Sequence, residues 1–350
     1  MSSNNHQGIL VTASKVHVPF KAELLQAIND PRFQKRAPHL VGILATKKED
    51  ARSYAERACE QIGINFELRL VGQAREGMDG AGVGIGVEEA ILEANEDDDV
   101  DGIMVYYPIY GDRQDQYLQS VVSPVKDVEG LNHQFLFNLY HNIRFISPLT
   151  LRPVPGAIET GDQPPEGTVK SILPCTPLAI VKVLEHVGVY NSLIPYGDRA
   201  RGKVITVINR SEVVGRPLAA LLANDGARVF SVDITGIVEF SKRPSKQSKY
   251  NPHHVINPTD LSLEEVLGRS DVVISAVPSQ SYKVPTAQLK DGCVCVNVAG
   301  EKNFEADVRE RASIYVPSVG VMTIAMLQRN LLRLCKYQDM VKEATQAKSA

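Results

Sequence analysis

No stretch of the sequence approaches the roughly 20 consecutive apolar residues that span a membrane. Basic residues are not in excess either: 38 lysines and arginines are outnumbered by 41 aspartates and glutamates, for a formal net charge of −3. Broad nucleic-acid binding needs a basic excess, so this balance argues against that class of protein. The first 20 residues lack the apolar core of a signal peptide and the arginine-rich, acid-poor composition of a transit peptide. We therefore expect a cytoplasmic protein with neither nucleic-acid nor membrane partners.

Residue patterns that bind metals are also missing. The five cysteines form no C-x-x-C motif, and the acidic run at 96–101 has no spacing typical of a ligand set. Cys293 and Cys295 flank Val294 in an apolar run, so as strand residues they would point the same way and pack. The sequence thus predicts no metal site, and its thiols suit a reducing compartment.

What the chain does contain is an alternation of strands and helices. In the first third, residues 39–45 and 101–107 are nearly continuous apolar runs, typical of strands buried on both faces, and residues 66–71 form a more alternating strand. Residues 49–63 carry an apolar stripe at helical spacing and end at Gly63, which predicts a helix.

The same alternation returns after a helix expected over 172–188, for which Thr176 is a good N-cap. Strands are predicted at 203–209, 227–233, 271–277 and 293–298, and helices around 213–224, 260–268 and 304–312. This rhythm predicts a parallel sheet with right-handed crossovers. A last amphipathic helix, at 322–341, is long enough to return and pack on the first part of the chain.

These elements predict an α/β protein of two domains, since 350 residues suffice for two of ordinary size. We assign residues 1–175 and 320–350 to the first domain and 176–319 to the second, a Rossmann-type parallel sheet. Three segments interrupt the pattern, near 72–86, 148–169 and 235–259, and we interpret them as insertions. The third is rich in basic residues, so a docking patch is the alternative to a solvated insertion there.

The glycine motif of dinucleotide-binding folds, G-x-G-x-x-G, is absent. Glycines at 80, 82, 84 and 86 alternate instead, and the strand before them ends near Val71, too far back for a tight turn.

A better nucleotide candidate begins where the apolar run VITVI, at 204–208, stops at Asn209-Arg210-Ser211. Gly215 and a helix follow, and backbone N–H groups at such a helix start attract phosphate. Asp233 ends the next strand, about where a dinucleotide fold places the acid that binds the adenosine ribose. The pattern also fits an ordinary capped helix entry followed by a strand-end turn, so both interpretations stay open on pattern alone.

The segment INRSEVVGRPLAALL, at 208–222, resembles the nucleotide loop of the methylenetetrahydrofolate dehydrogenase/cyclohydrolase family, in which Asn209 takes the place of a glycine. Further matches follow in the right order: SY at 53–54, KDVEG at 126–130, ILPCTP at 172–177, DVVISAVP at 271–278 and MTIAML at 322–327. Together they cover nearly the whole chain apart from the three insertions. Within the family, the chain is most similar to the fungal, cytosolic, NAD-dependent monofunctional branch.

The resemblance implies two domains around a cleft, with folate on the N-terminal domain, NAD on the C-terminal one, and a homodimer. It also implies oxidation of 5,10-methylenetetrahydrofolate to the methenyl form in one-carbon metabolism, which serves purine biosynthesis. A hydride would leave the one-carbon bridge for the nicotinamide, and adjacent nitrogens would stabilise the cation. Positioning should then dominate catalysis, which fits the lack of a nucleophile–histidine–acid set in the sequence.

By resemblance, the folate would contact Tyr54, Glu129, Pro174 and Cys175. A tyrosine on a helical stripe is more often a core residue, which is the alternative for Tyr54. Glu129 replaces the usual aspartate of the family at the pterin-binding position, while neighbouring Asp127 is better suited to holding the loop. Cys175 is a weak candidate for a nucleophile, because no partner base is visible in the sequence.

The catalytic positions implied by the family are Tyr54, Ala58 and Tyr106. Bifunctional members have a lysine where this chain has Ala58 and a glutamine where it has Tyr106. Because that pair serves the cyclohydrolase step, we expect a dehydrogenase without cyclohydrolase activity. The cofactor-binding positions implied by the resemblance are Asn209, Arg210, Ser211, Val214, Gly215, Asp233, Val277, Pro278 and Thr323. Residues 317–323 depart from the family pattern, which leaves the nicotinamide side least defined.

Two other functions use the same architecture. A dehydrogenase for another small substrate would need a lysine–aspartate catalytic pair in the first domain, and none stands out. A nucleotide-sensing regulator without catalysis would also tolerate the missing lysine, yet it would have no need of Tyr54, Glu129 and the ILPCTP segment.

Overall fold

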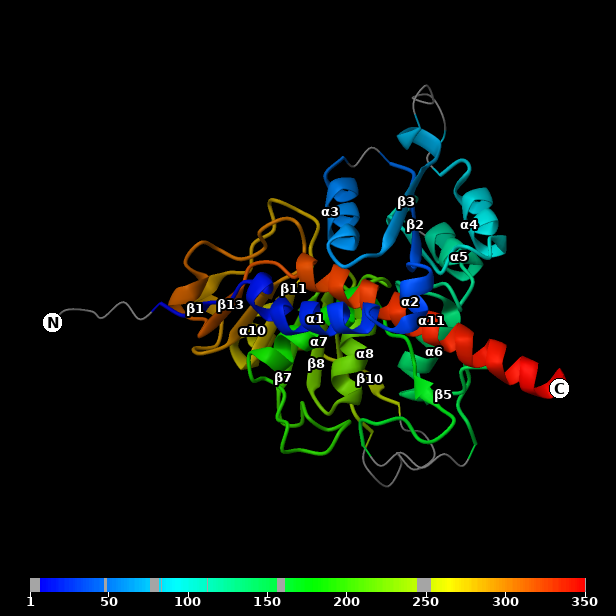
Figure 1. The fold of residues 1–350 in the computed structure, drawn as a ribbon. Helices are drawn as coiled ribbons and strands as arrows, with labels where there is room; N and C mark the ends of the chain where they lie inside the picture. Colours follow the sequence, from blue (N-terminus) through cyan, green and yellow to red (C-terminus); the bar gives the residue numbers. More distant parts are fainter. Residues whose placement is uncertain are drawn as a thin grey trace.

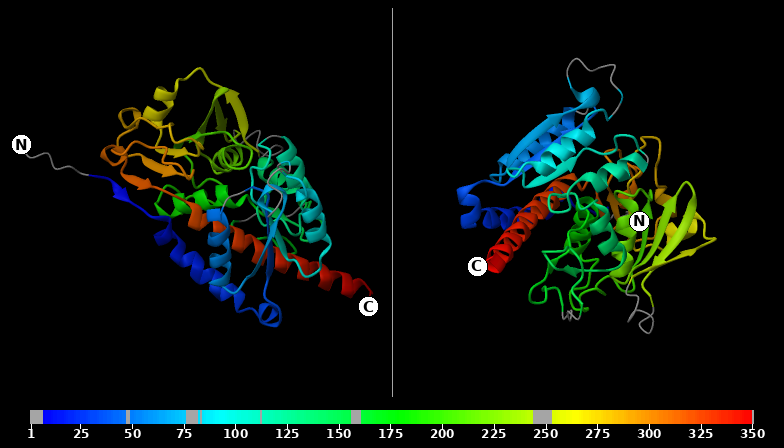
Figure 2. Two further views of the ribbon diagram at one scale, coloured as in Figure 1. Left: turned by 90° about the horizontal axis from the view of Figure 1, so that it is seen from above. Right: turned by 90° about the vertical axis from the view of Figure 1, so that its right-hand side faces the viewer.

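The computed structural model describes residues 7–46, 49–75, 82, 84–111, 113–155, 161–243 and 253–349. A small sheet and a large sheet lie in separate parts of the molecule, and one long C-terminal helix runs past both (Figures 1 and 2). This mixed arrangement confirms the predicted α/β fold class.

The small sheet has three parallel strands in the order β3-β2-β4, with β3 at Asn65–Leu70, β2 at His39–Leu44 and β4 at Gly102–Val105. All four residues of β4 and all but one of β2 are buried, as the apolar runs predicted. The helices α3 (Glu49–Glu60), α4 (Val87–Glu96) and α5 (Arg113–Val121) belong to this part of the molecule (Figure 1). The three strands and the helix predicted from the first third of the sequence are therefore confirmed.

The large sheet has eight strands in the order β1-β13-β12-β11-β7-β8-β9-β10. All four predicted strands form and pair in parallel, as β7 (Val204–Ile208), β8 (Arg228–Asp233), β11 (Val272–Ser275) and β12 (Val294–Asn297). Two predicted helices form as α8 (Gly215–Asn224) and α10 (Leu263–Arg269). The sheet is completed on one side by β13 (Ile314–Val316) and β1 (Ile9–Leu10), also parallel. The division of the chain into domains stays a prediction, although β1 joins the sheet of the second domain rather than the first.

The interpretation of 235–259 as a solvated insertion was wrong for its described part. Residues Gly236–Ser241 and Val255–Pro258 form β9 and β10, which extend the large sheet antiparallel to β8. Gly236 has φ +113°, a conformation that favours glycine and closes the tight turn from β8. Lys242 is not free for docking, since its ammonium pairs with Asp198 at 2.9 Å. The remaining lysines of the segment lie outside the described residues.

The helix predicted at 304–312 was also wrong: only a 3₁₀ turn, η3 (Val308–Glu310), forms there. Phe304 sits instead in a parallel bridge with Val284, whose N–H donates to the Asn303 carbonyl at 2.7 Å. That pairing holds the backbone extended where a helix would have to begin. The helix α7 (Cys175–His186) forms as expected but starts before Thr176, with Pro174 rather than Thr176 at its cap.

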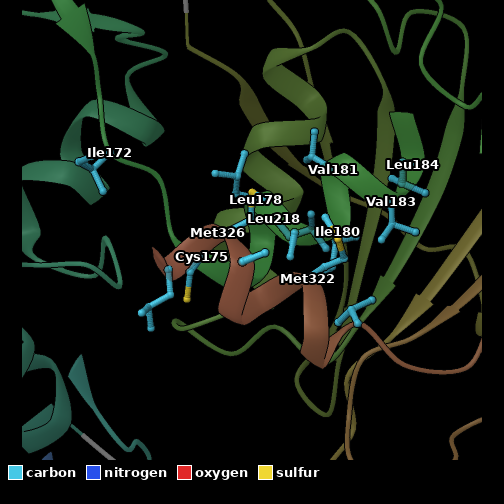
Figure 3. Packing of buried hydrophobic residues seen from close by; sticks show 14 of the residues in the cluster. Ile172, Cys175, Leu178, Ile180, Val181, Val183, Leu184, Leu218, Met322 and Met326 are labelled. Carbon is cyan, nitrogen blue, oxygen red and sulfur yellow. The ribbon is translucent and has the colours of Figure 1, made fainter. Parts of the chain in front are cut away.

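The last helix, α11 (Gly320–Ser349), packs against both α7 and α1 (Ala13–Ile28). Figure 3 shows Leu178 and Ile180 of α7 close to Met322 and Met326 of α11, all buried or nearly so. Burying a Leu, Ile or Met side chain contributes about 1.5–3 kcal/mol. The side-chain amide of Asn330 on α11 adds two hydrogen bonds, donating to the carbonyls of Val128 at 2.9 Å and Leu173 at 3.0 Å. The predicted return of this helix to the first part of the chain is thus confirmed.

The remaining elements are short. They comprise α2 (Pro31–Lys35), η1 (Gly72–Ala74), α6 (His133–Tyr140), η2 (Thr286–Gln288) and the antiparallel pair β5 (Phe145–Ile146) and β6 (Val169–Lys170). The predicted insertion at 148–169 connects β5 to β6, and most of its described residues are exposed or half-buried. That at 72–86 includes η1 and a turn into α4; its residues 76–81 and 83 lie outside the described part. Among the described helices, none has the length and apolarity needed to cross a bilayer.

Candidate active site

The predicted nucleotide residues gather where the strand order of the large sheet reverses. Strand β7 lies between β8, the next strand along the chain, and β11, a later strand. In open α/β sheets, ligands bind at the carboxyl ends of the strands at this point. Here the Asn209 amide, just after β7, donates to the Ala276 carbonyl, just after β11, at 2.7 Å.

Asn209 and Gly215 shape the loop between β7 and α8. Asn209 has φ +81°, a left-handed conformation that explains why glycine or asparagine suits this position. A Cβ on Gly215 would lie 1.8 Å from the Asn209 carbonyl oxygen, so only glycine fits there. The loop is therefore folded tightly on itself at the start of α8.

The start of α8 offers donors to an anion. The Ser211 hydroxyl accepts from the N–H groups of Val214 and Gly215 at 3.3 and 3.4 Å. In the described chain, the N–H groups of Ser211, Glu212 and Val213 make no hydrogen bond. Three free donors at the positive end of a helix form a suitable cradle for a pyrophosphate. This favours a nucleotide site over an ordinary capped helix entry.

Asp233 is oriented by the backbone at the end of β8. Its two carboxylate oxygens accept from the N–H groups of Arg210 at 2.7 Å and Ile234 at 2.8 Å. Each oxygen retains acceptor capacity for a further donor, such as a ribose hydroxyl.

The Arg210 side chain is hydrogen-bonded within the protein. Its guanidinium donates to the Ser231 carbonyl at 2.7 Å, the Gly236 carbonyl at 2.8 Å and the Ser231 hydroxyl at 3.0 Å. These bonds hold the cation on the β8–β9 turn, with several of its donors occupied.

The last group of predicted nucleotide-binding residues in this sheet directly follows β11. Val277 is held by Asn303, whose amide oxygen accepts from the Val277 N–H and whose amide nitrogen donates to the Val277 carbonyl, both at 2.9 Å. Asn303 is fully buried and its N–H donates to the side chain of Asn297 at 2.8 Å. In the sequence, the one signal of this pair of asparagines is a polar residue, Asn297, at the end of the apolar run CVCVN. Pro278 follows Val277 and is exposed.

Thr323 lies in the first turn of α11, where its hydroxyl donates to the Val319 carbonyl at 3.5 Å. The segment that departs from the family pattern is thus the entry to this helix.

Among the predicted folate-binding residues, Glu129 is held against the small sheet. Its carboxylate accepts from the N–H of Val105, at the end of β4, at 2.9 Å. Burial raises the pKa of Glu129 to about 8, against the opposing effect of that hydrogen bond. The side chain is therefore mostly protonated at neutral pH. Neighbouring Asp127 accepts from the N–H groups of Glu129, Gly130 and Asn132, which fits its predicted role in holding the loop.

Pro174 and Cys175 lie next to this loop. The Cys175 N–H donates to the Glu129 carbonyl at 3.0 Å, and a Cβ on Gly130 would lie 2.8 Å from the Pro174 nitrogen. The structure therefore brings Glu129, Pro174 and Cys175 together. Burial, followed by the charge of Glu129, raises the pKa of the Cys175 thiol to about 12. A thiol that stays protonated is a poor nucleophile, so the structure argues against that role.

Tyr54 and Ala58 share one face of α3 and line a cavity of about 320 Å³ together with parts of α1 and α11. Tyr54 is 41% exposed, which excludes the alternative that it is a core residue. Ala58 is half-buried, and its carbonyl accepts from the Gln328 amide at 3.0 Å.

Tyr106 is half-buried near Cys59 of α3 and Glu129. Its buried hydroxyl has no hydrogen-bond partner among the described residues, which marks it as available to a ligand. Burial, then Cys59 and Glu129, raises its pKa to about 12, above the ordinary value of a phenol.

Comparison with known proteins identifies the two halves of this arrangement. Residues 11–129 match the catalytic domain of tetrahydrofolate dehydrogenase/cyclohydrolase, and residues 174–242 match its NAD(P)-binding domain. A methylenetetrahydrofolate dehydrogenase (NAD⁺) of Schizosaccharomyces pombe is 49% identical over 96% of both chains. The chain belongs to the tetrahydrofolate dehydrogenase/cyclohydrolase family.

Other members of the family agree. The methylenetetrahydrofolate dehydrogenase (NAD⁺) of Saccharomyces cerevisiae is 47% identical over 96% of this chain and 98% of its own. The solved structure of the NAD-dependent 5,10-methylenetetrahydrofolate dehydrogenase from Saccharomyces cerevisiae superposes with a TM-score of 0.82, at 44% identity over 96% of this chain and 99% of that one. A bifunctional FolD protein of Macrococcus caseolyticus is more distant, at 25% identity over 93% of this chain and 97% of its own.

The family domains cover most of the candidate residues. Those in the first matched range are Tyr54, Ala58, Tyr106 and Glu129, and those in the second are Pro174, Cys175, Asn209, Arg210, Ser211, Val214, Gly215 and Asp233. Val277, Pro278 and Thr323 lie outside both ranges. The roles of all these residues remain predictions.

Proposed function

We propose that this protein oxidises 5,10-methylenetetrahydrofolate to 5,10-methenyltetrahydrofolate with NAD as the hydride acceptor, and that it has no cyclohydrolase activity. The observation that carries the proposal is the near-full-length similarity to NAD-dependent methylenetetrahydrofolate dehydrogenases, at 47–49% identity. The geometry supports it, because open N–H groups suited to a pyrophosphate, an acid at the ribose position and a carboxyl near Tyr106 all occur in one chain.

NAD would supply the nicotinamide carbon that takes the hydride. The residues present fit this cofactor: the open N–H groups of Ser211, Glu212 and Val213 suit the pyrophosphate, and Asp233 suits the ribose hydroxyls. The Arg210 guanidinium is held by the backbone of the β8–β9 turn, which limits its ability to neutralise a 2′-phosphate. These features favour NAD over NADP.

Glu129 would orient the pterin ring by accepting hydrogen bonds from its amino and ring N–H groups. A carboxylate accepts two such bonds, whereas the protonated acid accepts fewer. Because the pKa of Glu129 is about 8 without ligand, binding the ring would release a proton near neutral pH. Tyr54, which is exposed on α3, would stack along the folate.

The absence of cyclohydrolase activity follows from two side chains. Ala58 has no amine to accept a proton from an attacking water. Burial raises the pKa of the Tyr106 phenol to about 12, so it carries almost no phenolate at neutral pH. Neither residue therefore provides a general base, and methenyltetrahydrofolate would leave without being hydrolysed.

The direct test uses purified protein, methylenetetrahydrofolate and NAD, with the ultraviolet absorbance of NADH as the signal. We expect folate-dependent NADH formation, and a much smaller catalytic efficiency with NADP. Tight NAD binding without turnover would instead indicate a nucleotide sensor. Turnover only with a different small substrate would indicate a related dehydrogenase.

We further propose that the protein acts as a homodimer in the cytoplasm, within the one-carbon metabolism that serves purine biosynthesis. All five cysteines are free and buried, which suits a reducing compartment. Light scattering after size-exclusion chromatography tests the dimer, and a mass equal to one chain at micromolar concentration would contradict it.

A further inference from the structure

A second cavity, of about 160 Å³, has a different set of lining residues from the cavity of Tyr54 and Ala58. Its walls come from α6, the β5–β6 pair, α7, α8 and α11, together with the loop before β7 (Figure 1). None of the residues proposed above for substrate, cofactor or catalysis lines it. The cavity therefore has no assigned occupant.

Its most unusual property is its charge. Six cationic side chains line the cavity, against three acidic ones. Two of the cations are neutralised within the wall: Arg144 pairs with Asp225 at 2.8 Å and Lys182 with Glu185 at 2.7 Å. Arg329 pairs with a glutamate of α1 outside the cavity.

The other three cations, Lys170, Arg199 and Arg333, form no ion pair with any described residue. No hydrogen bond or ion pair of the Lys170 ammonium or the Arg333 guanidinium is found within the described chain. The Nε of Arg199 is buried and equally without a partner there. Among the described lining residues, Asp162 is the one acid that forms no ion pair with a cation.

Two of these three cations, Lys170 and Arg199, lie around the ring of Tyr196 together with Arg144. The charged groups of Arg144, Arg199 and Lys170 lie 4.8, 5.7 and 6.0 Å from the centre of Tyr196. Burial, then nearby Arg333, lowers the pKa of Lys170, and burial, then Arg329, lowers the pKa of Arg333. Like charges gathered in a cavity cost stability, and the buried Arg199 Nε without a partner among the described residues points to a missing one.

We propose that this cavity binds a phosphate group, held by Lys170, Arg199 and Arg333, at a site separate from the folate and nucleotide residues. The planar guanidinium groups match phosphate oxygens in geometry, and a dianion would offset most of the excess positive charge. The volume supports a small anion, because pockets for drug-sized ligands measure roughly 300–1,000 Å³. At about 30 Å³ per water, this cavity has room for a tetrahedral anion and a few waters.

Bound phosphate would connect three elements. Lys170 lies on β6, Arg199 in the loop before β7, and Arg333 on α11, which begins next to the candidate active site. The anion would thereby stabilise the packing of α11 and raise the melting temperature of the protein.

The experiment is a titration of the full-length protein with inorganic phosphate, followed by calorimetry and thermal unfolding. Saturating NAD is present throughout so that phosphate does not bind at the start of α8, and potassium chloride keeps the ionic strength constant. We expect saturable binding and a higher melting temperature with phosphate. In the variant Lys170→Met with Arg333→Met, phosphate should bind at least tenfold more weakly.

Lys336→Met is the matched control, because Lys336 is an exposed cation on α11 that does not line the cavity. It should respond to phosphate as the unmodified protein does. Equal phosphate affinity in the double variant and in this control, or equal stabilisation by chloride alone, would overturn the proposal.

A measurement on the unmodified protein guards against misfolding of the variant. Acylation of Lys170 by an amine-reactive reagent, followed by mass spectrometry, should slow at least severalfold with phosphate but not with chloride. A Lys170 acylation rate that phosphate leaves unchanged would contradict the proposal.

Glycerol 3-phosphate distinguishes the source of the anion. Binding of this monoester as tightly as phosphate would support a phosphorylated metabolite that enters by its phosphate end. Binding of inorganic phosphate alone would support the free anion. Either result supports a phosphate site, and binding of neither probe at this cavity would refute it. None of these readouts depends on dehydrogenase turnover.

Discussion

Replacing Glu129 with glutamine should change folate binding and protein stability in opposite directions. Glutamine has nearly the same shape and can still accept from the Val105 N–H, which Glu129 does at 2.9 Å. It removes only the ability to carry a charge. The variant therefore separates the carboxylate from its packing.

The effect on stability follows from the pKa of Glu129, which burial raises from 4.5 to about 8. A carboxyl with a raised folded-state pKa contributes stability that is present below pH 4.5 and is lost as the pH rises through 8. At about 1.36 kcal/mol per pKa unit, the full difference between the ordinary and the raised pKa corresponds to at most about 5 kcal/mol of stability. Since the side chain is not completely enclosed, we expect a loss of about 2–4 kcal/mol. Above pH 8, Glu129→Gln without folate should be more stable than the unmodified protein by this amount.

Folate binding should show the reverse trend. At pH 7 about one Glu129 in ten is ionised, so selecting the carboxylate costs about 1.4 kcal/mol of binding free energy. The KM for methylenetetrahydrofolate should fall by up to about tenfold between pH 7 and pH 9. In Glu129→Gln the KM should be higher and should vary little over that range, while the KM for NAD stays unchanged.

Glu129→Asp is the control, because aspartate is the residue expected at this position in the family and retains the charge. It should keep a pH-dependent folate KM, although its shorter side chain weakens binding. A folate KM of the unmodified protein that is flat from pH 7 to 9, or an unfolding free energy of Glu129→Gln that parallels the unmodified protein at every pH, would refute the reasoning.

Three further predictions concern the nucleotide, the folate and the missing second activity. Asp233→Ser should reduce the preference for NAD over NADP. A carboxylate 4–5 Å from a 2′-phosphate costs roughly 3–4 kcal/mol per unit charge pair at an effective dielectric near 20, which after screening is still more than tenfold in affinity. Equal catalytic efficiency of the unmodified protein with NAD and NADP would contradict this prediction. Tyr54→Ala should lower the catalytic efficiency with methylenetetrahydrofolate severalfold, because an aromatic stack contributes about 0.5–1.5 kcal/mol, and should leave NAD affinity unchanged. Weaker NAD binding or a lower melting temperature would instead assign the tyrosine a structural role. Methenyltetrahydrofolate should decay no faster with the protein than in buffer, and hydrolysis at a rate similar to dehydrogenase turnover would falsify the monofunctional assignment. Ala58→Lys combined with Tyr106→Gln should restore some hydrolysis where the cleft geometry is intact, since a misplacement of about 1 Å costs on the order of a hundredfold.

The candidate site could be predicted from the sequence in its parts but not in its electrostatics. The loop after β7 was recognisable, and the φ of +81° at Asn209 explains why this residue can stand where relatives are expected to have glycine. The roles of Arg210 and Glu129 depend on neighbours that are distant along the chain. Arg210 is held by carbonyls 21 and 26 residues away, and Glu129 by an N–H 24 residues away. No local pattern reports such contacts.

Of the fold, the sequence by itself determined the strand–helix alternation, the buried parallel strands and the long final helix, because each leaves a hydrophobic period in adjacent residues. The tertiary structure alone decided that β9 and β10 extend the sheet and that no α-helix forms at 304–312, where Phe304 forms an isolated bridge with Val284. It alone also brought Lys170, Arg199 and Arg333 to one cavity. Burial periodicity is a local property of the chain, whereas strand pairing, pKa and net charge in a cavity depend on distances through space, and only the folded chain sets those.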